Sequence, residues 1–462
     1  MKLKSLFTLG ALAALASNSA HALTVIRISA SNGDRGPTQT AISKILTTGW
    51  TFRGINGNTS SAGSLTTATG ANYGAWHGYY GSAIAANEVV IKVSFSGALA
   101  GVAAVSSNPQ VPQRYVATDG TGTGAVLDPT LPAAVLTTDY ELATADFGFS
   151  TNFQSTSPFN GLYNGVTYDG LVEELVGVSP LGFYASPGFP TTSANITTQQ
   201  AQLLYTTGAL PLALFTGDFT NDANKIVYAI GRNTDAGQRF GAYTEIGLGT
   251  STLVKVWKPT VTGENTSFTG IPFGGTVASH IPWPAETVSG IFSPEGSGGF
   301  TTGANLAPTL TRTLTGTAIT GGGLYPSATA AYYIGYVTPG DALTRILGVG
   351  TNLTTPLYDG GPNTASRGVA LSYNGVPLHN AVNGNAATVN TANIQNGKYT
   401  AWLYNRILKS VAFDSTPSFK LTFANALRDQ IKNTDATVGG GLKIDANFKV
   451  ERSTDGGLVT PL

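Results

Sequence analysis

The sequence contains no cysteine, so neither a disulfide bond nor a thiol-linked lipid anchor contributes to its structure. Charged residues are also scarce: they make up 11% of the chain, and the 25 basic side chains are balanced by 25 acidic ones. No basic stripe or run of like charge is present, which argues against nucleic acid or anionic lipid as a partner. Without disulfides the fold depends on a large buried core, and 462 residues suffice for about two to three domains.

Long apolar runs are missing after the N-terminus, and no later stretch is long enough to span a bilayer. The N-terminus has the three parts of a secretory signal peptide: the basic residues Lys2 and Lys4, an apolar run from Leu6 to Ala16, and the A-x-A sequence Ala20-His21-Ala22. We therefore predict a cleaved leader over residues 1–22, a mature chain beginning at Leu23, and a periplasmic or secreted protein without membrane insertion. A retained N-terminal anchor is the alternative.

Three segments share one pattern, in which a short strand rich in β-branched residues is followed by a polar loop and a helix. The strands and helices are Thr24–Ser29 with a helix opened by Pro37, Val89–Phe95 with Ala98–Val105, and Ile226–Ile230 with Ala236–Ile246. Repeated strand–helix units of this kind predict an α/β fold with a mainly parallel sheet.

Other elements are indicated by local signals. A capping box from Thr197 to Gln200 predicts a helix that ends near Gly208. Phe419 to Ile431 has a helical pattern, and the alternation from Leu442 to Val450 predicts a strand. Stretches rich in Gly, Thr and Ser predict long surface loops rather than domain linkers; they are Gly57–Asn72, Gly120–Gly124 and Ser293–Gly323.

Signatures of catalysis and of metal binding are weak. Ser150 lies in Gly-Phe-Ser-Thr-Asn, which lacks the second glycine of a nucleophile elbow, so a hydrolase of polar esters depends on this serine alone. Neither an H-E-x-x-H sequence nor a P-loop occurs. The stretch from Asp218 to Asn224 is rich in Asp and Asn but lacks the closing Glu of a calcium loop. We therefore predict no enzyme, no cofactor and no bound metal.

The junctions between strands and helices are the natural place for a ligand. Backbone N–H groups and the helix dipole favour an anion at a helix N-terminus, without any need for a basic patch. Open α/β sheets bind ligands at the carboxyl ends of their strands. The pattern therefore predicts a polar or anionic small molecule at these junctions, with ordinary βα turns as the alternative.

Five segments resemble, in the same order along the chain, the phosphate-binding subunits of ABC importers. They are Ala145–Ser150 for the D-F-G-x-S segment, Asn195–Asp218 for the capped helix before a Gly-Asp turn, Ile230–Arg239 for the R-x-x-x-S-G-T loop, Tyr333–Tyr336 for the I-G-Y strand, and Gly397–Thr400 for the Y-P segment. The resemblance runs from about Val25 to Leu408. It implies a type 2 periplasmic binding protein fold, with two α/β lobes joined by a hinge. Lobe 1 would comprise residues 23–177 and 396–462, and lobe 2 residues 178–395.

The resemblance also implies which residues would touch a ligand in the interlobe cleft. They are Thr38, Ser150, Thr151, Arg232, Ala236, Gly237 and Gln238. Arg232 keeps the family's spacing and can grip an oxyanion through two N–H groups. Thr151 stands where the family has an Asp that accepts a hydrogen bond from protonated phosphate, and Ala236 and Gln238 replace a Ser and a Thr. High-affinity phosphate recognition therefore does not carry over.

Two functions remain open at this point. The first is an exported solute-binding protein that takes phosphate, another oxyanion or a small organic ligand and delivers it to an ABC permease. The second is a secreted structural or adhesive protein on the same scaffold that has lost the ligand site. The altered loop at Ala236 and Gln238 and the Gly/Thr-rich insertions favour the second function.

Overall fold

The computed structural model describes residues 23–462 except 48, 56, 66–67, 82–86, 131–132, 250–251, 261–273, 284–297, 349–365 and 383–384. The predicted leader, residues 1–22, lies outside the described residues, as does the beginning of the Ser293–Gly323 stretch. None of the described helices is long and apolar enough to cross a membrane.

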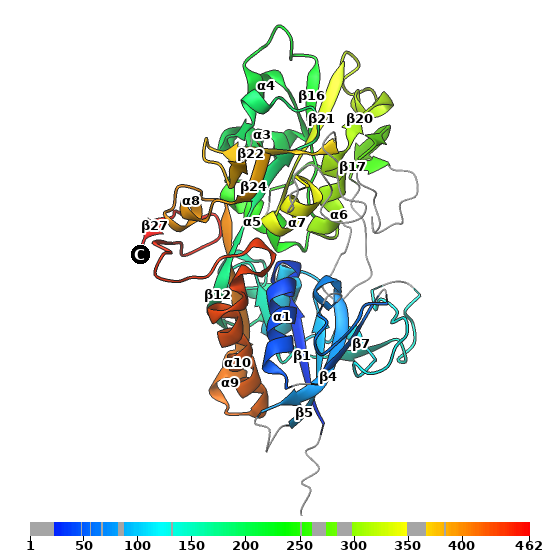
Figure 1. Ribbon diagram of the computed structural model, residues 1–462, viewed down its shortest axis with the longest axis vertical. Helices are drawn as coiled ribbons and strands as arrows, with labels where there is room; N and C mark the ends of the chain where they lie inside the picture. The colour runs from blue at the N-terminus through cyan, green and yellow to red at the C-terminus, as the bar shows by residue number, and fades with distance from the viewer. Residues whose placement is uncertain are drawn as a thin grey trace, which may run out of the picture.

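The first sheet has eight strands in the order β12-β25-β9-β1-β5-β4-β2-β3 and occupies the lower half of Figure 1. Its strands are β1 (Thr24–Ala30), β2 (Thr51–Gly54), β3 (Thr59–Ser61), β4 (Tyr73–Tyr80), β5 (Asn87–Ser94), β9 (Phe147–Ser150), β12 (Leu171–Pro180) and β25 (Trp402–Ser410). The central strands β9, β1 and β5 pair in parallel, and the flanking strands pair antiparallel.

The second sheet has six strands in the order β14-β22-β13-β21-β16-β15 and occupies the upper half of Figure 1. They are β13 (Gly182–Ala185), β14 (Asn195–Ile196), β15 (Ala209–Pro211), β16 (Lys225–Ala229), β21 (Ala330–Val337) and β22 (Val369–Tyr373). Parallel pairing joins β16 to β21 and β14 to β22, and the other pairs are antiparallel. The predicted α/β class is confirmed. The prediction of mainly parallel sheets is wrong: antiparallel pairs predominate in both sheets, some in hairpins such as β4–β5 and others formed by β13 and β25, the strands that follow the crossings between the sheets.

The predicted helices are confirmed, with small changes at their ends. They are α1 (Arg35–Ile45), α2 (Ala98–Ser106), α3 (Thr198–Thr207), α5 (Gly237–Glu245) and α10 (Phe419–Asn433). In α3 the capping box forms in both directions, and Gly208 ends the helix with a left-handed φ of 87° that glycine adopts without strain. Because the 3-10 turn η1 (Asn32–Asp34) already bends the chain, α1 begins before Pro37.

Shorter elements complete the described fold. The helices are α4 (Ala213–Thr216), α6 (Gly303–Leu306), α7 (Pro339–Arg345), α8 (Thr391–Gln395) and α9 (Val411–Ser415). The strands are β6 (Ser107–Asn108), β7 (Gln113–Val116), β8 (Tyr140–Ala143), β10 (Gly161–Tyr163), β11 (Val166–Tyr168), β17 (Trp257–Thr260), β18 (Thr276–Val277), β19 (Ser279–Pro282), β20 (Thr313–Leu314), β23 (His379–Val382), β24 (Asn385–Val389), β26 (Val450–Glu451) and β27 (Thr460–Pro461).

The chain crosses between the two sheets at two adjacent places. From β12 it passes through Leu181 into β13, and it returns through Ala401 into β25. The Leu181 N–H donates to the Ala401 carbonyl at 2.9 Å. The Tyr399 hydroxyl donates to the Leu181 carbonyl at 2.6 Å. The two crossings are therefore hydrogen-bonded to each other and lie side by side.

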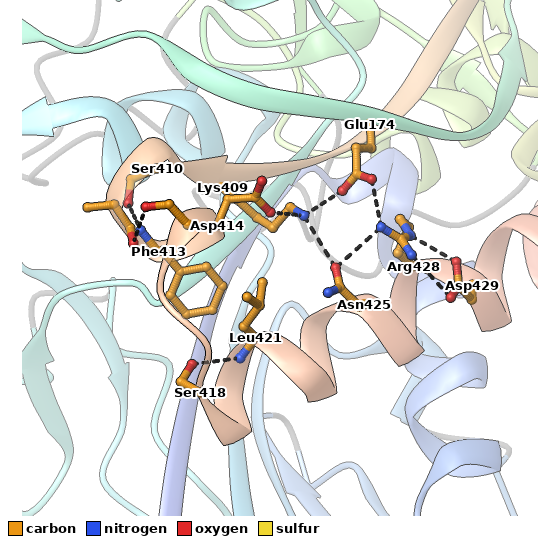
Figure 2. Close-up of polar contacts among 12 residues, drawn as sticks. Glu174, Lys409, Ser410, Phe413, Asp414, Ser418, Leu421, Asn425, Arg428 and Asp429 are labelled. Carbon is orange, nitrogen blue, oxygen red and sulfur yellow. Dashed lines mark hydrogen bonds and ion pairs between the residues drawn. The ribbon is translucent and has the colours of Figure 1, made fainter.

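Helix α10 is held on the edge of the first sheet by buried and half-buried charges (Figure 2). The Lys409 side chain is 2% exposed and its ammonium group contacts Glu174, Asp414 and the Asn425 amide oxygen. The other Glu174 oxygen accepts a hydrogen bond from Arg428 at 2.6 Å. Since Glu174 belongs to β12 and Lys409 to β25, this network joins two strands to α9 and α10 and keeps the buried lysine paired.

The predicted strand from Leu442 to Val450 is wrong. Leu442 forms a single β-bridge to Val178, and the regular strand β26 begins only at Val450. Between them Asp445 turns the chain: its carboxylate accepts from the Asn447 N–H at 2.8 Å, and its carbonyl accepts from the Phe448 N–H. An Asp that bonds to backbone two residues ahead favours a turn over a strand.

The prediction of a surface loop over Ser293–Gly323 is also wrong in its described part. After residue 297 the chain forms α6, the 3-10 helix η5 (Ala307–Thr311) and β20. Leu306, Leu310 and Leu314 are buried in the core on one face of the second sheet. The high glycine and threonine content led to the prediction of a loop. The apolar residues of this segment recur every four residues, a spacing that places them together in the core.

The last residues of the chain cover the junction between the two sheets. We call residues 442–462 the C-terminal strap. Arg452 donates to Glu245 of α5 at 3.0 Å and to the Thr400 carbonyl at 2.6 Å. Asp455 accepts a hydrogen bond from the Phe153 N–H, just after β9, at 2.9 Å. The strap thus contacts both sheets and the crossing, and the C-terminus lies at the level of the junction in Figure 1.

Candidate functional site

The helix N-termini that were predicted to bind a ligand lie between the two sheets. They pack directly against each other and against the residues after β9, so no gap separates them. A Cβ atom at Gly237, the first residue of α5, would lie 2.0 Å from Thr151 Oγ1 and 2.6 Å from Ala98 Cβ. A Cβ atom at Gly33 would lie 3.1 Å from the methyl group of Thr151. Thr151 is 1% exposed and Ser150 is fully buried. These residues therefore form a packed contact between the sheets, with no space for a ligand among them.

Asp235 brings a carboxylate to this contact. A Cβ atom at Gly97, the residue before α2, would lie 2.4 Å from Asp235 Oδ2. The Asp235 side chain therefore lies at the N-terminus of α2, where the exposed N–H groups and the helix dipole favour negative charge. Because Asp235 comes from the second sheet and α2 packs on the first, an internal carboxylate occupies the position in which an anion was predicted.

A separate cavity of about 280 Å³ lies beside this contact and is lined from both sides of the junction. Its first-sheet side includes Asn32 and Arg35, and its second-sheet side includes Arg232, Gln238, Gly303 and Asp341. Of the predicted ligand residues, Arg232 and Gln238 line it, whereas Thr38, Ser150, Thr151, Ala236 and Gly237 do not. Thr38 is fully buried within α1.

Arg232 is fixed in the cavity wall by uncharged partners. Its Nε donates to the Phe300 carbonyl at 3.0 Å and its Nη2 to the Thr301 carbonyl at 2.8 Å. Its Nη1 donates to Gln238 Oε1 at 2.7 Å. Burial lowers the pKa of Arg232 to about 10, so the guanidinium remains charged at neutral pH. The structure therefore holds a positive charge at the cavity that its hydrogen-bond partners do not neutralise.

Arg35 supplies a second guanidinium from the opposite side of the cavity. Its Nε donates to the Thr69 carbonyl at 2.9 Å, and its Nη1 donates to the side chain of Asn72. Burial lowers the pKa of Arg35, and the nearby Asp341 carboxylate opposes this shift. The resemblance favoured Thr38 over Arg35 in this loop, because it implies ligand contacts mainly through backbone and hydroxyl groups.

Asp341 is the third charged residue of the cavity and was not predicted. It lies in α7, directly after β21. The signal was present in the sequence: the predicted strand Tyr333–Tyr336 is followed by Pro339, a residue typical of the first turn of a helix. A third strand–helix junction at the same cleft could therefore have been inferred.

Asp34, next to the cavity, is buried with one carboxylate oxygen unbonded among the described residues, and it gives a testable pH dependence. It is 2% exposed, and its Oδ2 has no hydrogen-bond partner in the described part of the chain. Burial raises its pKa well above the ordinary value, and Arg406 opposes the shift. A carboxyl whose pKa is raised in the folded state stabilises the protein at low pH, and this contribution is lost as the pH rises through that pKa. At pH 8 the charged Asp34 therefore lowers the stability of the folded protein.

We therefore expect Asp34→Asn to raise the melting temperature at pH 8 and to change it little at pH 4. Thermal unfolding followed by circular dichroism at both pH values measures this. An equal gain at both pH values, or a loss at pH 8, would contradict the assignment of Asp34 as a carboxyl whose burial outweighs the attraction of Arg406.

Comparison with known proteins gives structural similarity only. No family model matches the chain, and no curated protein matches it. Among solved structures, an ABC-type phosphate transport receptor from Vibrio cholerae is similar with a TM-score of 0.38 and 10% identity, over 90% of this chain and 99% of that one. A possible phosphate binding protein from Planctomyces limnophilus is similar with a TM-score of 0.36 and 10% identity, over 92% of this chain and 94% of that one. Similarity at this level assigns no function to the chain.

Proposed function

We propose that the chain is an exported solute-binding protein that holds a small polar or anionic ligand between two lobes. Residues 23–177 and 396–462 would form lobe 1, and residues 178–395 lobe 2, with the hinge at the paired crossings. The observation that carries the proposal is the cavity of about 280 Å³ with a guanidinium group from each side. Pockets for small molecules commonly lie between domains and use a few well-placed polar groups.

The charges of the cavity favour a ligand that carries negative charge. Arg35 and Arg232 contribute two positive groups and Asp341 one negative group. Arg232 has five N–H groups, and its Nε, Nη1 and Nη2 are all engaged by oxygens of the protein. Arg35 uses one bond at Nε and one at Nη1 for the protein. Arg35 therefore has more N–H groups left for a ligand, and Arg232 acts mainly through its charge.

A ligand bound across the junction would couple the two lobes. Closure around it would present a different surface to a membrane permease, and we therefore propose an ABC permease as the partner. The second candidate function is a secreted structural or adhesive protein on the same scaffold. The tight contact of Gly237 with Thr151 favours it, because this contact fills the place where the resemblance puts the ligand.

Filling the cavity should separate these functions. We expect the wild type to bind phosphate, sulfate or a small organic acid in calorimetry, and Ala304→Leu to weaken that binding by at least about tenfold, or about 1.4 kcal/mol. Ala304 lines the cavity at the start of α6, where leucine is a good helix former.

Ala446→Leu is the matched control, because Ala446 is exposed and lies in the turn of the strap. It should leave both the affinity and the melting temperature unchanged. Equal affinity of the wild type and Ala304→Leu would place the ligand elsewhere. Failure of the wild type to bind any of these compounds would favour the structural function.

A further inference from the structure

The three charges of the cavity are held apart from one another. Asp341 Oδ1 is 3.7 Å from Arg345 Nε, a partner that does not line the cavity. Its Oδ2 lies over Gly303, where a Cβ atom would be 2.3 Å from Oδ2 and 3.4 Å from Gln238 Oε1. Since Gly303 has no side chain, the Asp341 carboxylate and the Gln238 amide oxygen stand next to each other at the cavity wall.

The two arginines are directed to other partners. Arg232 bonds to carbonyl and amide oxygens, and Arg35 bonds to Thr69 and Asn72. Burial lowers the pKa of both guanidinium groups and the Asp341 carboxylate opposes this shift, so Asp341 is electrostatically coupled to each of them. The cavity therefore presents two positive groups and two acceptor oxygens, Asp341 Oδ2 and Gln238 Oε1, the second of which also accepts from Arg232.

We propose that this cavity takes a small zwitterion, in which an ammonium group lies beside one or two carboxylates, of the size of an acidic amino acid. The carboxylates would face Arg35 and Arg232, and the ammonium group would donate to Asp341 Oδ2 and Gln238 Oε1. This inference rests on the proposed function and names its ligand class. A simple dianion satisfies the arginines but leaves a carboxylate of the protein facing a like charge, which is unfavourable.

The volume and the charge balance limit the ligand further. A cavity of about 280 Å³ lies just below the usual range of about 300–1,000 Å³ for small-molecule pockets, so it suits one amino acid better than a peptide or an oligosaccharide. Two guanidinium groups and one carboxylate carry a net charge of the opposite sign to a molecule with two carboxylates and one ammonium group. An acidic amino acid is therefore the complementary class.

The test compares glutamate with glutarate, which differ only in the ammonium group. In calorimetry we expect the wild type to bind glutamate at least about tenfold more tightly than glutarate. Asp341→Asn should reduce glutamate affinity to the level of glutarate, and should leave glutarate affinity unchanged or higher. Circular dichroism and thermal melting of each variant establish that it is folded.

Arg345→Gln provides the control, because it removes the other partner of Asp341 without altering the cavity lining. It should keep or increase the preference for glutamate. Equal binding of glutamate and glutarate by the wild type would overturn the zwitterion assignment and leave the proposed function standing. An unchanged preference in Asp341→Asn would overturn the role of Asp341. Binding of none of the anions or amino acids would overturn both proposals.

Discussion

The Arg452→Met protein should be less stable than the wild type by about 3–5 kcal/mol at neutral pH, the effect typical of breaking a buried ion pair by removing one partner. Arg452 and Glu245 have side chains that are 2% and 8% exposed, and their ion pair measures 3.0 Å. In the wild type the guanidinium carbon of Arg452 lies 4.3 Å from the centroid of the Trp402 ring. Methionine keeps much of the side-chain length and so preserves much of this packing. The loss therefore comes chiefly from leaving Glu245 buried without its cation.

The pH dependence of this loss has a definite sign. Burial already raises the pKa of Glu245 above its ordinary value, with Arg452 opposing the shift, so removing Arg452 raises that pKa further. A carboxyl with a raised folded-state pKa keeps its contribution at low pH and loses it as the pH rises through that pKa. Urea unfolding of wild type and Arg452→Met at pH 8 and pH 5 should show a smaller difference at pH 5.

Glu245→Gln in the Arg452→Met background is the matched variant. Because it removes the uncompensated charge, the double variant should recover a large part of the lost stability at pH 8. A loss that is the same at both pH values and is not relieved by Glu245→Gln would mean that packing over Trp402, rather than charge, accounts for the effect.

The Gly237→Val protein should fail to bring the two sheets together at their closest contact. A Cβ atom at this position would lie 2.0 Å from Thr151 Oγ1 and 2.6 Å from Asn152 Oδ1, far inside van der Waals contact. Overpacking of a buried contact costs about 1–3 kcal/mol, and a junction between two sheets can relieve it by opening. We therefore expect a lower melting temperature and a larger radius of gyration in small-angle X-ray scattering.

Two further variants decide whether the contact itself is responsible. Gly170→Val is the control, since a Cβ atom there has no neighbour within 4 Å, and it should change neither quantity. Thr151→Ala removes the nearest atom, so it should lessen the defect of Gly237→Val in a double-mutant cycle. An unchanged radius of gyration in Gly237→Val would show that the junction accommodates the side chain without opening.

Local signals predicted the elements that depend on local interactions. The α3 capping box needs only residues within one turn, and it forms as expected between Thr197 and Gln200. The direction of a strand relative to its neighbours is not a local property, so the sheets were predicted to be more parallel than they are. The turn at Asp445 interrupts an alternation that would otherwise favour a strand.

The candidate site was predictable to the extent that it is formed by single strand–helix junctions. Arg232 and Gln238 follow β16 within one such junction, and both line the cavity. Arg35 and Asp341 are some three hundred positions apart and face one cavity only because the two sheets meet. The predicted ligand position is filled by the contact of Gly237 with Thr151. This contact joins segments that are distant in the sequence, so local sequence patterns could not predict it.

The C-terminal strap also sets an order of assembly during synthesis. Arg452 and Asp455 leave the ribosome after every strand of both sheets, yet their partners lie as far back as Phe153. A nascent chain can thus complete each sheet before the strap forms its hydrogen bonds across the junction. A chain terminated after residue 441 would carry both finished sheets without these hydrogen bonds, and its junction would be the first place open to proteolysis.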